Sequence, residues 1–227
     1  MKKWMYVIIP IFAAFVPLVL SFDEKVHFAR YWIPYVVSAL SVGVVYLVWD
    51  VLAVWKGHWR FNDEYVGKWR LFHLPLGEYL FFVCIPYACL FLYEVGVAYF
   101  GNDQLLPWEG WWSWLLGGVS IVFAWFMRRR GYTVFALFSA AVFFVLQGML
   151  FPGLLGHTGF LFFLALSTVG FLVVDGLYTS LPTIFYNTTA NTNVRLFTIP
   201  VEDFVYNISH LGLVLLVYLQ VKSWIGL

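Results

Sequence analysis

Long apolar runs separated by short polar segments dominate the pattern of the 227-residue chain. A helix needs about 20 apolar residues to cross the hydrocarbon core of a bilayer. Trp or Tyr marks several ends of these runs, as is typical of residues at the membrane–water interface. The pattern predicts seven transmembrane helices, at residues 4–21, 31–55, 74–100, 111–127, 132–151, 158–178 and 199–221.

Composition agrees with a membrane location. Hydrophobic residues make up 63% of the chain and charged residues only 11%, which leaves too little polar surface for a water-soluble globule of this size. The formal net charge of +1 provides no field that would attract nucleic acid. We therefore expect membrane lipid as the surroundings, no nucleic-acid partner, and a function that depends on local sites.

Basic residues are unevenly distributed between the predicted loops. If the N-terminus is inside, ten Lys and Arg residues lie on the inner side and three on the outer side, which accounts for all 13. Cytoplasmic segments of membrane proteins carry such an excess. We therefore expect the N-terminus inside and the C-terminus outside.

Polar residues recur in the two halves of the chain at a constant offset of 125 residues. Apolar matches between membrane spans mean little, because all spans share Leu, Val and Phe. A gap-free match at polar residues and proline is much harder to obtain by chance, and it indicates an internal repeat. The matched pairs are Asp50 with Asp175, Asn62 with Asn187, Arg70 with Arg195, and Pro75 with Pro200.

The repeat predicts an all-α membrane fold of two parallel three-helix units. Three helices per unit would invert the second copy, so the unpaired run at 111–127 is expected to act as a connector that restores the parallel orientation, as in transporters with parallel repeats. We expect the first unit in residues 1–110, the connector helix in 111–128 and the second unit in 129–227. A pseudo-two-fold axis along the membrane normal would bring the two proline-marked helix starts together at the inner face.

Acidic residues follow both prolines: Glu78 in the first copy, and Glu202 and Asp203 in the second. Proline suits the first position of a helix, and the helix dipole stabilises acids there, so capping alone explains one acid at each start. The acids, however, lie among aromatic residues at a membrane boundary. The flanking aromatic residues are Tyr79, Phe81, Phe82, Phe204 and Tyr206.

Ionisable groups at membrane depth are costly and are functional candidates by default. Aromatic walls deprive a carboxylate of hydration, so a carboxyl between them can hold a proton at neutral pH and act as a general acid. Glu78, Glu202 and Asp203 are therefore candidate catalytic residues, and the five aromatic residues are candidate substrate-binding residues.

Further polar residues near the inner face are candidates for supporting roles. The repeated aspartates end their spans at the inner side, where each could hydrogen-bond a neighbouring helix start; a structural brace or an ion pair with a repeated arginine explains them equally well. The repeated asparagines are expected to shape the inner loops. A lone membrane histidine is more often a packing residue than a catalyst. The supporting candidates are Asp50, Asp175, Asn62, Asn187, Arg70, Arg195 and His210.

No sequence motif indicates a metal or a cofactor. The chain has no HExxH pattern, no glycine-rich phosphate loop and no Asp-rich diphosphate motif, and Cys84 and Cys89 alone cannot form a thiolate metal site. Glu94 has no acidic counterpart at the 125-residue offset, and we expect it to be incidental.

Across most of both repeats, the chain resembles the lycopene cyclase domain family. The signature is a proline, one residue, two acids and an aromatic residue, in register at both helix starts. Gly77 stands where the family usually has the first acid of the first copy. The resemblance rests on Ser21–Phe28, Trp49–Asp50, Leu74–Phe82, Ile85–Cys89 and Ile199–Phe204.

The resemblance implies a cofactor-independent isomerase of a bacterial cytoplasmic membrane, which converts lycopene or a related linear carotenoid into a product with β-ionone rings. A carboxyl would protonate the terminal double bond, the resulting cation would close the ring, and a second carboxyl would remove a proton. Aromatic walls would exclude water and stabilise the cation. Of Glu78, Glu202 and Asp203, one would act as the proton donor and another as the base.

Two other functions fit part of the pattern. A membrane carrier or proton-coupled transporter also has parallel repeats and membrane acids, but would be expected to continue its polar residues through the bundle. A non-catalytic carotenoid-binding or partner subunit would account for Gly77. The sequence does not indicate an oligomeric state.

Overall fold

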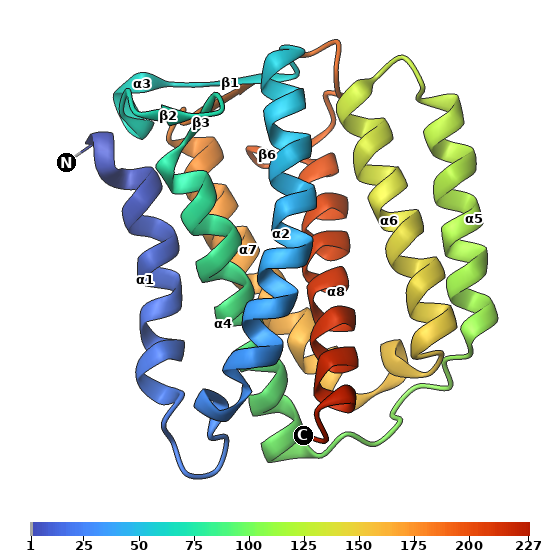
Figure 1. Cartoon of the computed structure of the whole chain (residues 1–227). Helices are drawn as coiled ribbons and strands as arrows, with labels where there is room; N and C mark the ends of the chain where they lie inside the picture. The colour runs from blue at the N-terminus through green and yellow to red at the C-terminus, as the bar shows by residue number, and fades with distance from the viewer. Residues whose placement is uncertain (1) are drawn as a thin grey trace.

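In the computed structural model, which describes residues 2–227, the chain forms a bundle of long helices (Figure 1). Among these residues, six helices are long and apolar enough to cross a membrane, and α5 is a shorter apolar helix. The prediction of an all-α membrane fold is confirmed. The long helices are α1 (Met5–Leu20), α2 (Trp32–Trp55), α4 (Leu76–Phe100), α5 (Gly110–Phe126), α6 (Gly131–Leu150), α7 (Thr158–Ser180) and α8 (Val201–Trp224).

Short elements connect the long helices. The helix α3 has a single turn, at Asp63–Val66, and 3-10 helices lie at Lys2–Trp4, Phe28–Tyr31 and Leu154–Gly156. Figure 1 shows the two chain ends at opposite ends of the bundle, as expected for an odd number of long helices that run back and forth.

Three pairs of short antiparallel strands gather at one end of the bundle, which we call the ribbon end (Figure 1). Two of the pairs are hairpins that directly precede α4 and α8, so these helices begin two residues later than the sequence pattern predicts. The strands are β1 (Trp59–Phe61) with β4 (Ile184–Tyr186), β2 (Arg70–Leu71) with β3 (Leu74–Pro75), and β5 (Arg195–Leu196) with β6 (Ile199–Pro200).

Strand register confirms the internal repeat. In the two hairpins Arg70 lies opposite Pro75 and Arg195 lies opposite Pro200, which is the same geometry 125 residues apart. Strands β1 and β4 are also copies of each other, and they pair with each other around the central pair of Arg60 and Phe185. A pseudo-two-fold axis therefore passes through this ribbon.

Helix packing follows the same symmetry. Helix α2 of the first copy packs on α8 of the second, and α7 of the second copy packs on α4 of the first. Helix α1 packs on α4 as α6 packs on α8. The two copies therefore share one core, and the division of the chain at residues 110 and 128 stays a prediction.

Two asparagines fasten the ribbon across the axis. The side-chain amide of Asn62 donates to the carbonyl of Pro182 at 2.9 Å, and that of Asn187 donates to the carbonyl of Gly57 at 2.9 Å. The backbone amides of both asparagines donate to the next carbonyl of the opposite segment, at 2.9 and 2.8 Å. Each asparagine therefore joins the two copies as well as shaping its own loop.

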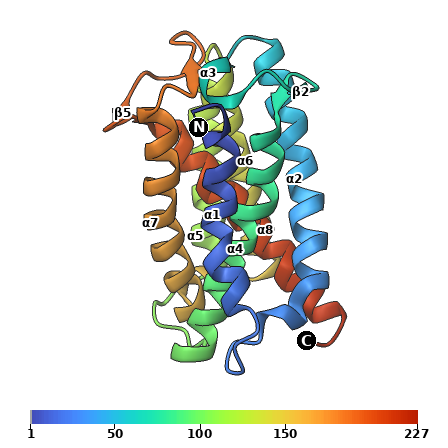
Figure 2. The same cartoon turned by 90° about the vertical axis from the view of Figure 1, so that its left-hand side faces the viewer.

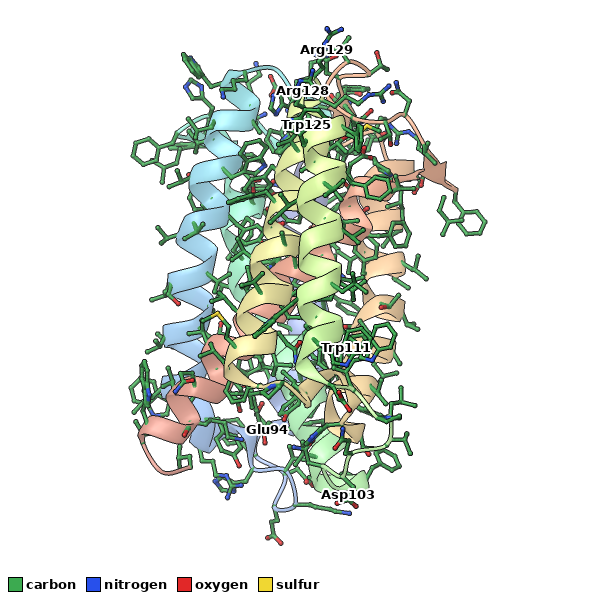
Figure 3. The ribbon with its side chains drawn as sticks, turned by 90° about the vertical axis from the view of Figure 1, so that its right-hand side faces the viewer. Glu94, Asp103, Trp111, Trp125, Arg128 and Arg129 are labelled. Atoms are coloured by element: carbon green, nitrogen blue, oxygen red, sulfur yellow. The ribbon has the colours of Figure 1, made fainter. Side chains whose placement is uncertain are left out.

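Helix α5 lies at the edge of the bundle and packs on α6 (Figure 1). Figure 3 shows Trp125, Arg128 and Arg129 at the ribbon end, and Glu94 at the opposite end of the molecule. The exposed Trp111 and Trp125 lie near the two ends of α5, which is the arrangement expected of membrane-interface residues.

The expectation that Glu94 is incidental was wrong. Its side chain is buried, at 5% exposure, and accepts from Lys222 Nζ at 2.5 Å and from the Tyr218 hydroxyl at 2.8 Å. The ion pair joins α4 to α8 at the end opposite the ribbon. A comparison of the two copies could not find it, because the partner of Glu94 is a base on the other copy rather than an equivalent acid.

Replacing Asn187 with Asp tests the contact between the copies. The new carboxylate would face the Gly57 carbonyl without a donor, so we expect Asn187→Asp to lower the free energy of unfolding by about 1–3 kcal/mol. Thermal unfolding of the purified protein in detergent measures the loss.

Asn193→Asp is the matched control, because the Asn193 amide makes the same kind of bond, at 2.8 Å, to Thr188 within one loop. If both variants lose the same stability, the asparagine bridges do not hold the copies together more than an ordinary loop contact does.

Candidate functional site

Beneath the ribbon lies a buried cavity of about 80 Å³, formed by the starts of α4 and α8 and the ends of α2 and α7. Four carboxyl groups line it, and we call it the acidic cavity. They are Asp50, Glu78, Asp175 and Asp203. Asp50 corresponds to Asp175 and Glu78 to Asp203 at the 125-residue offset, so each copy supplies one acid from a helix end and one from a helix start.

Tyrosines donate hydrogen bonds to the two acids at the helix starts. The Tyr6 hydroxyl, on α1, donates to Glu78 at 2.6 Å, and the Tyr132 hydroxyl, on α6, donates to Asp203. Tyr186, on β4, donates to the other oxygen of Asp203 at 2.6 Å. Glu78 is thus held by one phenol and Asp203 by two.

Tyr186 lies outside the membrane-spanning helices. Burial raises its pKa well above the usual value, and the neighbouring charge of Asp203 raises it further, so the phenol keeps its proton at physiological pH. Tyr186 is therefore a stable hydrogen-bond donor to Asp203.

The remaining polar groups of the acidic cavity are less completely bonded. The Tyr206 hydroxyl donates to Asp50 at 3.2 Å. Asp175 Oδ2 and His210 Nε2 are buried and have no hydrogen-bond partner among the described residues. The ring of His210 packs against the ring of Phe82 at 5.0 Å between centroids, and this contact leaves Nε2 without a hydrogen bond. These unpaired atoms are available to a bound molecule.

The aspartates do not form ion pairs with the repeated arginines. Arg70 pairs instead with Asp63, at 2.6 Å, and Arg195 donates to the carbonyl of Thr198 at 2.6 Å. Both arginines thus brace the loops of the ribbon end.

Glu202 lies beside the acidic cavity but is not among its lining residues. One carboxyl oxygen accepts from the Thr133 hydroxyl at 2.7 Å and from the backbone amide of Thr192 at 2.6 Å. Glu202 therefore ties α8 to α6 and to the preceding loop. Of the three candidate catalytic acids, the structure brings Glu78 and Asp203 together in one cavity.

The aromatic candidates divide in the same way. Phe81, Phe82 and Tyr206 line the acidic cavity. Tyr79, on α4, instead donates to the Leu71 carbonyl of the preceding hairpin at 2.7 Å. Phe204 packs edge-on to the ring of Phe171 at 4.9 Å between centroids. The lining residues that the sequence did not single out are Tyr6, Trp59, Tyr132, Phe171, Tyr178, Ile184, Tyr186 and Asn207.

Gly77 allows α1 to approach α4. A Cβ atom at this position would lie 2.3 Å from a ring carbon of Tyr6 and 2.4 Å from its carbonyl oxygen. Any side chain at position 77 would therefore push away the helix that carries the hydrogen-bond donor of Glu78. Close packing against α1 therefore explains the glycine at position 77. Its counterpart in the second copy, Glu202, has room for a side chain, which bonds to Thr133 on α6.

A bundle of apolar helices with carboxyl groups in an aromatic-lined cavity defines an integral membrane protein with an acidic site inside its helix bundle. The family model described as lycopene cyclase matches residues 3–96 and 129–221, and the chain belongs to this family. Membership supports a carotenoid cyclase of the isomerase type with a linear carotenoid as substrate. No curated protein and no solved structure matches the chain.

Replacing Gly77 with Ala tests this packing. The added methyl would overlap Tyr6, so we expect Gly77→Ala to lower the free energy of unfolding by about 1–3 kcal/mol, measured by thermal unfolding in detergent.

Gly118→Ala is the control, because a Cβ atom at that exposed helical position meets nothing within 4 Å, and no loss is expected. Equal stability of the two variants would show that α1 can move away from Gly77 at no cost.

Proposed function

We propose that the chain is a lycopene β-cyclase, which converts the linear end group of lycopene or a related carotenoid into a β-ionone ring. The observation that carries the proposal is the acidic cavity, where carboxyls from both copies meet among aromatic side chains at membrane depth. A carboxyl adds a proton to the terminal double bond, the tertiary cation is attacked by the neighbouring double bond, and loss of a ring proton to a base gives the product. One proton enters and one leaves, so the reaction is an isomerisation.

We assign the proton donor to Glu78 and the base to Asp203. Hydrogen bonds from hydroxyl groups stabilise the negative charge of a carboxylate, and Asp203 accepts two of them from Tyr132 and Tyr186. Glu78 accepts only one. The carboxyl with two donors is the one held as a carboxylate, which is the form that can balance the cation and then accept its proton.

Aromatic walls support the cationic intermediate. Trp59, Phe81, Phe82 and Tyr206 line the acidic cavity, and the faces of such rings attract cations. Aromatic walls that keep water away from the reacting end group would also protect a carbocation from capture by hydroxyl. Asp50 and Asp175 also line the acidic cavity.

Glu202 is proposed to act as a positioning residue rather than as the acid or the base. Its bonds to Thr133 and Thr192 fix the first turn of α8, which carries Asp203. Asn62 and Asn187 position the ribbon that covers the cavity, and His210 fills its floor.

A transporter is less well supported by the arrangement. The acidic cavity continues toward the membrane centre into a groove whose lining is apolar apart from Ser167, Asp175 and Asn207. A non-catalytic subunit would account for Gly77, but the close contact with Tyr6 accounts for that glycine by packing alone.

We propose a bacterial cytoplasmic membrane as the location, with the ribbon end on the cytoplasmic side. Arg128 and Arg129 lie at this end (Figure 3), together with the basic loops around the ribbon, and cytoplasmic segments carry the excess of basic residues. The acidic cavity would then lie near the inner leaflet.

Three substitutions test the assignment in cells that accumulate lycopene. We expect Glu78→Gln and Asp203→Asn each to lower ring formation by about 100-fold or more, the usual contribution of general acid–base catalysis. Glu202→Gln keeps the oxygen that accepts from Thr133 and Thr192, so it should retain most of the activity. Pigment analysis by chromatography, normalised to protein in the membrane fraction, gives the result.

Glu202→Gln is also the matched control for the loss of an acid at this helix start. Loss of activity in Glu202→Gln with retention in Asp203→Asn would reverse the roles of these neighbours. Unchanged lycopene in cells that contain folded wild-type protein would refute the cyclase.

Reporter fusions test the orientation. Because the N-terminus is proposed to be inside, alkaline phosphatase fused after Leu227 should be active in the periplasm, and a fusion in the loop at Arg129 should be inactive. The opposite pattern would place the ribbon end outside.

A further inference from the structure

An apolar groove of about 310 Å³ adjoins the acidic cavity. Residues Phe81, Phe171, Asp175 and Asn207 line both spaces, so the groove leads directly to the carboxyl groups. Its walls come from α1, α4, α7 and α8. Small residues leave the space open, among them Ala13, Ala88 and Gly170.

The groove opens sideways toward lipid. Leu166 and Val173, which line it, are 37% and 58% exposed on a bundle whose outer surface faces hydrocarbon. Figure 2 views the molecule from this side, with α1 in front and α7 beside it. A long apolar molecule could therefore pass from the bilayer between these helices without entering water.

The corresponding place in the other copy is filled. At the 125-residue offset, Phe171 is replaced by Tyr46 and Ile85 by His210, whose rings pack together at 4.8 Å between centroids. Trp49 takes the place of Val174 and stacks on a neighbouring ring at 3.9 Å.

Helix packing shows the same difference. Helix α2 packs against α4, whereas the equivalent helices α7 and α8 hardly touch. The pseudo-symmetry is therefore broken where a substrate chain would lie.

We propose that this groove holds the polyene arm of the carotenoid while one end group occupies the acidic cavity, so that the chain has a single substrate arm site despite its two copies. The proposal rests on the proposed cyclase function and names where its substrate lies.

A membrane phospholipid fits the groove less well than a polyene. Neither the groove nor the acidic cavity has Lys or Arg among its lining residues, so a phosphate headgroup would find no counter-ion there. The inner end of the groove instead presents Asp175 and Asn207. A hydrocarbon without a headgroup suits this combination of an apolar channel and acidic end.

Gly170 offers the sharpest test. A Cβ atom at this position meets nothing within 4 Å, so a large side chain can enter the groove without disturbing the backbone. We expect the series Gly170→Ala, Gly170→Leu and Gly170→Trp to lower ring formation progressively, with Gly170→Trp lower by about tenfold or more. Gly118→Trp is the control, because position 118 is equally open but lies on α5, and it should stay within about twofold of wild type.

Binding is measured separately from catalysis, in the background of Asp203→Asn. Lycopene that co-purifies with this variant should fall when Gly170→Trp is added and should not fall with Gly118→Trp, at equal thermal stability. If the wild type forms no rings, the cyclase proposal fails, but the measurement of lycopene binding still tests the groove proposal.

Two results would overturn the groove proposal. One is ring formation and lycopene binding in Gly170→Trp that equal those of Gly118→Trp. The other is unchanged lycopene binding with loss of co-purified phospholipid, which would identify the groove as a lipid site.

Discussion

The pairing of β1 with β4 is the constraint on which the rest of the structure depends. Each strand is the copy of the other, and the pair lies on the pseudo-two-fold axis. The pairing fixes the distance between the two copies at the end where α4 and α8 begin. It also covers the space between them with Trp59, Ile184 and Tyr186. Because the axis passes through the ribbon, the equivalent acids of the two helix starts, Glu78 and Asp203, face the same space.

Burying four carboxyls in that space is costly, since a polar group without a partner loses the hydration it had in water. Phenols that line the acidic cavity supply partners for Glu78, Asp203 and Asp50. Tyr6 and Tyr132 come from the first helix of each copy, so the outer helices are coupled to the acids of the cavity. The contact of Gly77 with Tyr6 shows how closely the backbone must approach for this to work.

Much of the fold could be predicted from the sequence. Seven apolar runs predicted the long helices, and the recurrence of polar residues at an offset of 125 predicted the internal repeat. The strands could not be predicted, since two or three residues carry no periodicity. The sequence also could not predict which of Glu202 and Asp203 faces the acidic cavity. Neighbours on a helix point about 100° apart, and the sequence does not give the rotation of the helix about its axis. Tyr6 and Tyr132 lie 126 rather than 125 residues apart, so a comparison of the two copies at an offset of 125 does not pair them. Phe61 and Tyr186 correspond at the offset of 125 residues, but only Tyr186 has a hydroxyl group that can donate a hydrogen bond to an acid.

The ion pair of Glu94 with Lys222 has a consequence for how the protein exchanges its ligand. The two central helices are joined at one end by this pair and at the other by the ribbon, and both ties restrain the walls that α4 and α8 give to the groove. The other two walls belong to α1 and α7. On the proposed function, a water-insoluble carotenoid would enter and leave through this groove within the plane of the leaflet, without ever meeting the aqueous phase.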